Sequence, residues 1–212
     1  IEVKKFRSVD HRPHEVFNQA AALGGVLGKL FQQRLQFIRL RRTSEDRQIQ
    51  FVDDGGRIDH GTMFGYAVRE GLIDPRKSVQ MGIRTTFTGE TTMGFRIVYA
   101  DEVHDSSSGQ LAAIIKKQVG KSKAYLTFDI DCLDPSVAPG TGTPIAGGMT
   151  YHQAASVIRK LTDVNFVAMD VVEVSPPYDH ADITSIAGAS LVMEYLCLKA
   201  WQRGARATPM PE

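Results

Sequence analysis

Cysteine is scarce in this sequence. Among 212 residues only Cys132 and Cys197 carry a thiol, and they lie in unrelated contexts with no CxxC pair or metal-finger spacing. This scarcity excludes a disulfide framework and a structural zinc site of the usual kinds. We expect both side chains to be reduced thiols in a cytoplasmic protein.

An excess of one charge sign is also missing, since 25 Lys and Arg residues face 24 Asp and Glu residues. A near-neutral balance gives no electrostatic basis for binding nucleic acid or a membrane surface. Long apolar runs are absent as well: a stretch such as Val164 to Val174 is too short to span a bilayer, and the opening IEVKKFRSVD lacks the apolar block of a secretory signal. The sequence therefore predicts a soluble protein without nucleic-acid or membrane partners.

The amount of apolar sequence predicts one ordinary domain over residues 1–212, because 42% hydrophobic content suffices for a single core. From Ser78 onward, short β-type runs alternate with helical ones. Continuous apolar runs such as AYLTF suit strands covered on both faces, which is typical of a mostly parallel sheet in an α/β fold. The predicted strands are SVQMGIR, FRIVYA, KAYLTFDID and NFVAMDVVEVS, and the predicted helices are SSGQLAAIIKKQVG, YHQAASVIRKLTD and DITSIAGASLVMEYLCLKAWQR.

The first 50 residues show no βα unit. HEVFNQAAALGGVLGKLFQQRLQFIRL, residues 14–40, has the pattern of one long helix broken at Gly24 and Gly25.

Three acids stand at the end of one predicted strand: Asp129, Asp131 and Asp134 in TFDIDCLDP. Side chains alternate along a strand, so Asp129 and Asp131 are expected to point the same way at its carboxyl end. Two such carboxylates repel one another unless a divalent metal joins them through hard oxygen ligands. The alternative is a cap with an Asx turn, which suits Asp134 before Pro135. Spacing leaves both interpretations open.

The whole stretch FDIDCLDPSVAPGTGTPIAGGMT resembles the signature of the ureohydrolase family, which includes arginases and agmatinases. Residues 58–87 (IDHGTMFGYAVREGLIDPRKSVQMGIRTTF) and 169–179 (MDVVEVSPPYD) are similar to further segments of that family. The resemblance implies an arginase-like three-layer αβα fold, two manganese ions, a homo-oligomer (trimer or hexamer) and hydrolysis of a guanidino compound to urea and an amine. The segments DHGTMF and APGTGTP resemble agmatinases more than arginases, which implies agmatine as the substrate and putrescine as the amine.

The resemblance also implies roles for particular residues. Asp129 would bridge both manganese ions, and Asp131 would bind one of them. Glu173, at the end of the strand FVAMDVVEV, would hold the substrate guanidinium, for which a planar carboxylate is well suited. His60 matches the histidine proposed to shuttle protons, and Thr143 would contact the substrate or the bridging water.

The sequence departs from the family at two metal motifs, because neither GGDH nor DAHxD is present. QIQFVD, residues 48–53, predicts a strand that ends at Asp53, which would be the first ligand of the second motif. Family members are also longer. Two hypotheses follow: a ureohydrolase whose sequence here omits loops, or a truncated or degenerate relative with a structural or regulatory role and no turnover.

Overall fold

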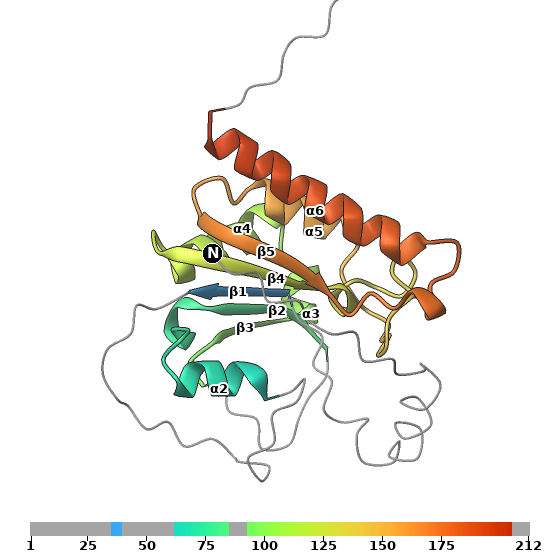
Figure 1. The fold of residues 1–212 in the computed structure, drawn as a ribbon, viewed down its shortest axis with the longest axis horizontal. Coiled ribbons are helices and arrows are strands. Elements are labelled where there is room, and N and C mark those ends of the chain that lie inside the picture. Colours follow the sequence, from blue (N-terminus) through green and yellow to red (C-terminus); the bar gives the residue numbers. More distant parts are fainter. Residues whose placement is uncertain (1–34, 40–61, 85–92, 205–212) are drawn as a thin grey trace, which may run out of the picture.

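The computed structural model of this protein describes residues 35–39, 62–84 and 93–204. Its strands form a sheet in the order β3-β2-β1-β4-β5 (Figure 1). The strands are β1 (Leu35–Arg39), β2 (Val79–Ile83), β3 (Arg96–Tyr99), β4 (Lys123–Asp129) and β5 (Asn165–Val172). All four strands predicted from Ser78 onward are confirmed, each with slightly narrower bounds.

The sheet is mostly parallel, as predicted. β2 pairs with β3 and β4 pairs with β5 in parallel, so these strands run in one direction. β1 lies antiparallel between β2 and β4, with Leu35 opposite Met81 and Phe128. The prediction of one helix over residues 14–40 is wrong for its last part, because Leu35–Arg39 is a strand; residues 14–34 and 40 lie outside the described residues. Pairing on both sides outweighs the local helical pattern there.

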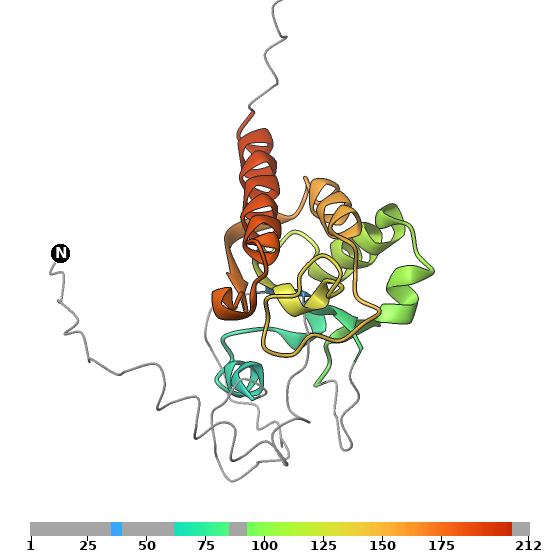
Figure 2. The same cartoon turned by 90° about the vertical axis from the view of Figure 1, so that its right-hand side faces the viewer.

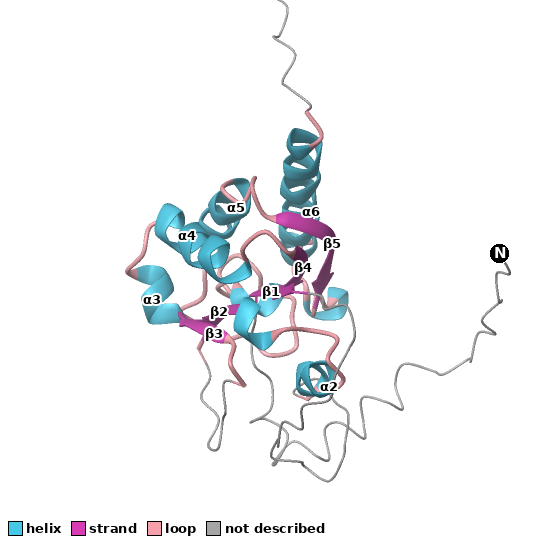
Figure 3. Cartoon of the chain, turned by 90° about the vertical axis from the view of Figure 1, so that its left-hand side faces the viewer, coloured by secondary structure: helices cyan, strands magenta, loops and turns pink. Residues whose placement is uncertain are grey.

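Helices cover both faces of the sheet, which confirms the three-layer αβα prediction. α4, α5 and α6 lie on one face and α2 on the other, while α3 lies beside β2 and β3 (Figures 2 and 3). The helices are α2 (Met63–Arg69), α3 (Ala100–His104), α4 (Ser108–Val119), α5 (Tyr151–Arg159) and α6 (Ile183–Gln202). The three predicted helices correspond to α4, α5 and α6.

Capping fixes where two of these helices begin. The side chain of Ser107 accepts a hydrogen bond from the backbone of Gln110, whose own side chain returns to the Ser107 backbone. Thr150 and Gln153 form the same reciprocal arrangement at the start of α5. Such a capping box satisfies two backbone N–H groups that a helix start leaves without partners.

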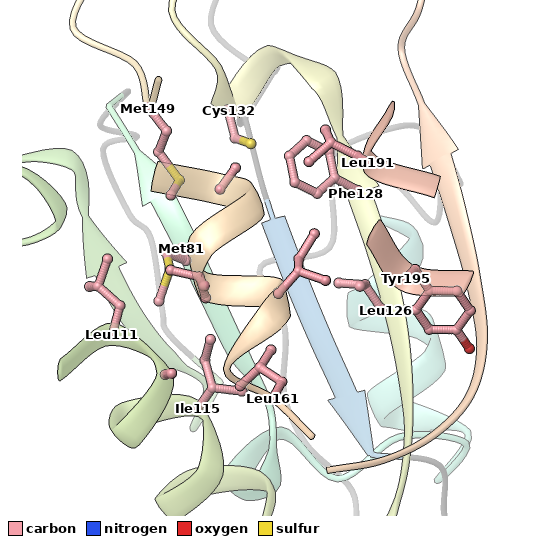
Figure 4. Packing of buried hydrophobic residues seen from close by; sticks show 14 of the residues in the cluster. Met81, Leu111, Ile115, Leu126, Phe128, Cys132, Met149, Leu161, Leu191 and Tyr195 are labelled. Carbon is pink, nitrogen blue, oxygen red and sulfur yellow. The ribbon is translucent and has the colours of Figure 1, made fainter. Parts of the chain in front are cut away.

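The main core lies between the sheet and helices α4 to α6 (Figure 4). Ala124, Leu126 and Phe128 of β4 are fully buried in it. Tyr125, between them in sequence, packs against a second cluster on the α2 face. This two-sided burial explains why β4 appears in the sequence as a continuous apolar run. The second cluster consists of Val68, Ile73, Ile83, Phe95 and Ile97.

Within the described ranges, α6 alone is long and apolar enough to cross a membrane by length and composition. A core helix of a soluble protein passes the same test, so this is weak evidence. Leu191, Tyr195 and Leu198 of α6 join the main core, whereas Ile186 and Met193 are exposed. That the protein has no membrane partner stays a prediction.

Candidate functional site

The candidate site begins where β4 ends, at Asp129. The chain turns there into a short 3-10 helix, η3 (Ile130–Cys132), and the Asp129 carboxylate accepts a hydrogen bond of 2.9 Å from the backbone N–H of Asp131. The expectation that strand alternation places both carboxylates is therefore wrong, because Asp131 is not in the strand. The tight turn of η3 places Asp131 instead, and its side chain is buried.

Two threonine hydroxyls donate to the carboxylate of Asp131, Thr141 to Oδ1 and Thr143 to Oδ2. Burial raises the pKa of Asp131 above its ordinary value, the Thr143 hydrogen bond lowers it, and the charge of Glu173 raises it further. A buried carboxylate in this setting is stabilised by a positive partner. Thr141 and Thr143 thus both lie beside Asp131, while the contact of Thr143 with substrate or water stays a prediction.

Glu173 directly follows β5 and lies within electrostatic reach of Asp131. Its backbone is left-handed, with φ of 65°. A side chain in this conformation costs about 1–2 kcal/mol relative to ordinary backbone. A Cβ added at Gly142 would lie 3.9 Å from Oε2 of Glu173, so the glutamate side chain lies next to the Gly-Thr loop. Backbone strain of this kind concentrates at functional sites.

The loop that carries Thr141 is fixed to the start of α6. The N–H of Gly140 donates to the hydroxyl of Thr184 at 2.7 Å, and the carbonyl of Gly140 accepts from the N–H of Ser175 at 2.8 Å. A Cβ at position 140 would lie 2.5 Å from the Cβ of Asp179. Only glycine fits this close approach, which explains the first glycine of PGTGTP.

Asp134 has the turn role that the sequence allowed. Its carboxylate accepts from the backbone N–H groups of Ser136 (2.9 Å), Gly147 (2.8 Å) and Gly148 (3.1 Å). The hydrogen bonds from Ser136, and then those from the glycines, lower the pKa of Asp134 to about 2. The carboxylate of Asp134 therefore stabilises the turn at Ser136 and joins it to residues 147 and 148. The turn interpretation is confirmed for this acid.

Of the predicted site residues, the structure brings Asp129, Asp131, Thr143 and Glu173 to one edge of the sheet. Asp53 and His60 lie outside the described residues. Thr141 was not predicted individually, although it belongs to the same PGTGTP motif. Arg84, whose guanidinium lies 2.7 Å from the carbonyl oxygen of Asp131, was also missed; an arginine directly after an apolar strand was the available signal.

The donor chemistry fits a divalent metal in part. Asp129 and Asp131 supply hard anionic oxygens of the kind manganese accepts. However, in the part of the chain that the structure describes, no three His, Cys, Asp or Glu side chains are grouped so as to hold a metal ion. The described residues can therefore contribute ligands but do not make a complete set.

The acids after β4 and β5 lie at the carboxyl ends of parallel strands in a sheet covered by helices on both faces, which is where α/β proteins usually place their functional residues. A model of the arginase family matches residues 46–197. The chain belongs to the arginase family.

Relatives in sequence are agmatinases. That of Chromobacterium violaceum is 54% identical over 146 residues, which is 69% of this chain and 45% of the relative. That of Photorhabdus laumondii is 53% identical over 155 residues, or 73% of this chain and 50% of the relative. This chain thus spans about half the length of the curated relatives it matches.

Solved structures agree with the fold. A hypothetical agmatinase from Burkholderia thailandensis matches with a TM-score of 0.69 and 46% identity, over 73% of this chain and 49% of that one. Proclavaminate amidino hydrolase from Streptomyces clavuligerus matches with a TM-score of 0.66 and 42% identity, over 70% of this chain and 50% of that one. The arginase-like fold predicted from the sequence is confirmed.

Proposed function

We propose that this chain hydrolyses a guanidino compound, with agmatine as the substrate, to urea and putrescine. The observation that carries the proposal is the meeting of Asp129, Asp131 and Glu173 at the edge where β4 and β5 end. The likeness to agmatinases over about 70% of the chain supports this choice of substrate.

The proposal includes two manganese ions, which Asp129 and Asp131 would help to hold. Asp53 would supply a further carboxylate from outside the described residues. Bound metal would supply a nucleophile at neutral pH by lowering the pKa of a water molecule. The hydroxyls of Thr141 and Thr143 would orient the carboxylate of Asp131.

Glu173 would hold the substrate. A carboxylate and a guanidinium are both planar, so two parallel hydrogen bonds fix the orientation of the guanidinium as well as its position. The left-handed backbone at Glu173 turns the chain sharply after β5, and the neighbouring Gly142 leaves room beside the carboxylate. This arrangement would set the guanidinium carbon facing the acids that follow β4.

His60 would move the proton. Addition of water to the guanidinium carbon gives a tetrahedral centre, and the bond from this carbon to the alkyl nitrogen then breaks. His60 would take one proton from the attacking water, so that hydroxide adds to the carbon, and would then donate this proton to the alkyl nitrogen. The remaining hydroxyl proton would pass to the released amine, so that putrescine leaves with this nitrogen protonated and neutral urea remains. An imidazole suits this task because it titrates near neutral pH.

A second candidate is a degenerate relative without turnover. It is favoured by the departure of this sequence from the family at the GGDH and DAHxD metal motifs. In this alternative the domain would act as a structural or regulatory subunit.

Urea release separates the two candidates. The purified chain is incubated with saturating manganese and with agmatine, arginine or guanidinobutyrate in parallel, with Glu173→Gln as the control variant. We expect urea from agmatine with the unmodified chain and little with the variant. Absence of urea from all three substrates would favour the degenerate relative. Light scattering after size-exclusion chromatography tests the expected homo-oligomer.

A further inference from the structure

A β-bulge in β2 determines where Arg84 points. The register with β3 shifts between Met81 and Ile83, and Gly82 between them has φ of 86°. Met81 packs in the main core, whereas Ile83 packs in the cluster on the opposite face. In a regular strand, residues two apart such as Met81 and Ile83 would share one face, but Gly82 is an extra residue in the bulge, so the two lie on opposite faces. The bulge therefore changes the side of the sheet that each following side chain faces, including Arg84.

The guanidinium of Arg84 joins three chain segments near Asp131. Its Nη2 donates to the carbonyl oxygens of Asp131 (2.7 Å) and Ile145 (2.9 Å). Its Nη1 donates to those of Cys132 (3.2 Å) and Gly82 (3.2 Å). These acceptors belong to η3, to the loop after the Gly-Thr motif and to β2.

These carbonyl oxygens explain why the residue at position 84 is an arginine. The last carbonyls of a helical turn lack partners within it, and a cation at that end is favourable. Burial lowers the pKa of Arg84, and the charges of Cys132, Asp134 and Asp131 counteract this effect. Only a planar fork donates to carbonyls on two sides at once, whereas a lysine ammonium is a single point.

We propose that Arg84 is a positioning residue for the reaction: aimed by the bulge at Gly82, its guanidinium holds η3 and residue 145 in place and so fixes the carboxylate of Asp131. It acts through the backbone carbonyl oxygens that its guanidinium contacts. Its catalytic consequence rests on the function proposed above, but its effect on the backbone does not.

Hydrogen–deuterium exchange of the whole chain tests whether Arg84 holds η3 and residue 145 in place, and this test does not require turnover. In Arg84→Lys we expect amides of residues 130–134 and 145–149 to exchange roughly ten-fold faster, because charge-assisted hydrogen bonds are lost. Amides of α4 should exchange as before. Arg159→Lys is the matched control, since Arg159 pairs with Glu194 between α5 and α6, away from the site. Unchanged exchange near Asp131, or an equal rise in α4, would overturn the proposal.

Gly82→Ala gives a second, independent test. It retains the arginine but strains the bulge, and its Cβ would lie 3.4 Å from the Cβ of Cys132. We expect the same local increase in exchange.

The kinetics of urea release give a further test. Arg84→Lys should lower kcat with little change in KM, because Glu173 still holds the substrate guanidinium. A change in KM alone would contradict a positioning role. Absence of urea from the unmodified chain would reject the proposed function. The exchange result would still show whether Arg84 holds η3 and residue 145 in place.

Discussion

The hydroxyl of Thr141 lies 3.0 Å from the backbone carbonyl oxygen of Glu173. The same hydroxyl contacts the carboxylate of Asp131. A single side chain therefore links the segment after β4 to the segment after β5. Because a hydroxyl has only one hydrogen, it donates to one of these acceptors at a time. Thr141 therefore lies between the carboxylate of Asp131 and the backbone of Glu173.

Asp134 should stabilise the fold at neutral pH but not in acid. Its pKa of about 2 lies below the ordinary value of about 3.9, so its contribution is present above pH 4 and is lost as pH falls through 2. We expect Asp134→Ala to lower the free energy of unfolding by about 1–2 kcal/mol at pH 7 through its lost hydrogen bonds. Urea denaturation from pH 2 to 7 measures this. A difference between the two proteins that does not shrink in acid would contradict the assignment.

Tyr125 should have the opposite pH dependence. Burial, followed by its 2.7 Å hydrogen bond to Asp170, raises the pKa of Tyr125 to about 12. The unfolded chain loses this proton near pH 10, so stability is lost as pH rises from 10 to 12. Tyr125→Phe should make the decline above pH 10 shallower, as measured by thermal unfolding at several pH values. Identical slopes for the two proteins would show that another group is responsible.

The left-handed backbone at Glu173 should cost stability. Glycine accepts φ of 65° without strain, whereas alanine does not. We expect Glu173→Gly to be more stable than Glu173→Ala by about 1 kcal/mol, and both to lose substrate binding. Chemical denaturation of the two variants measures the free-energy cost of the left-handed backbone by itself, since both variants lack the carboxylate. Equal stabilities would indicate that the strain is relieved in solution.

His60 should affect turnover without affecting the metal. If it donates the proton to the leaving amine, His60→Ala lowers kcat by roughly 10²- to 10⁴-fold while manganese content stays near that of the unmodified chain. Added imidazole should restore part of the rate. A loss of rate that follows a loss of manganese would instead make His60 a metal ligand.

The sheet and its helices were predictable because apolar periodicity and capping residues are local properties of the sequence. The strand Leu35–Arg39 was not, since its conformation depends on pairing with β2 and β4 rather than on its own pattern. Similarly, Asp129 could be placed from the end of β4, but the 3-10 turn that buries Asp131 could not. Arg84 escaped prediction because its acceptors are backbone carbonyls, which leave no mark in the side-chain sequence.

The most direct test of the proposed metal-dependent hydrolase is the manganese content of Asp131→Asn by elemental analysis, measured together with urea release from agmatine. The amide keeps the shape of the buried side chain, removes its charge and turns one acceptor oxygen into a donor. A threonine hydroxyl can accept from this donor, so folding should be preserved while a metal ligand is lost. Asp163→Asn is the control, because Asp163 is exposed and pairs with Lys116. The account predicts reduced manganese and no urea for Asp131→Asn, with both unchanged for Asp163→Asn. Full manganese occupancy with normal urea release in Asp131→Asn would contradict it.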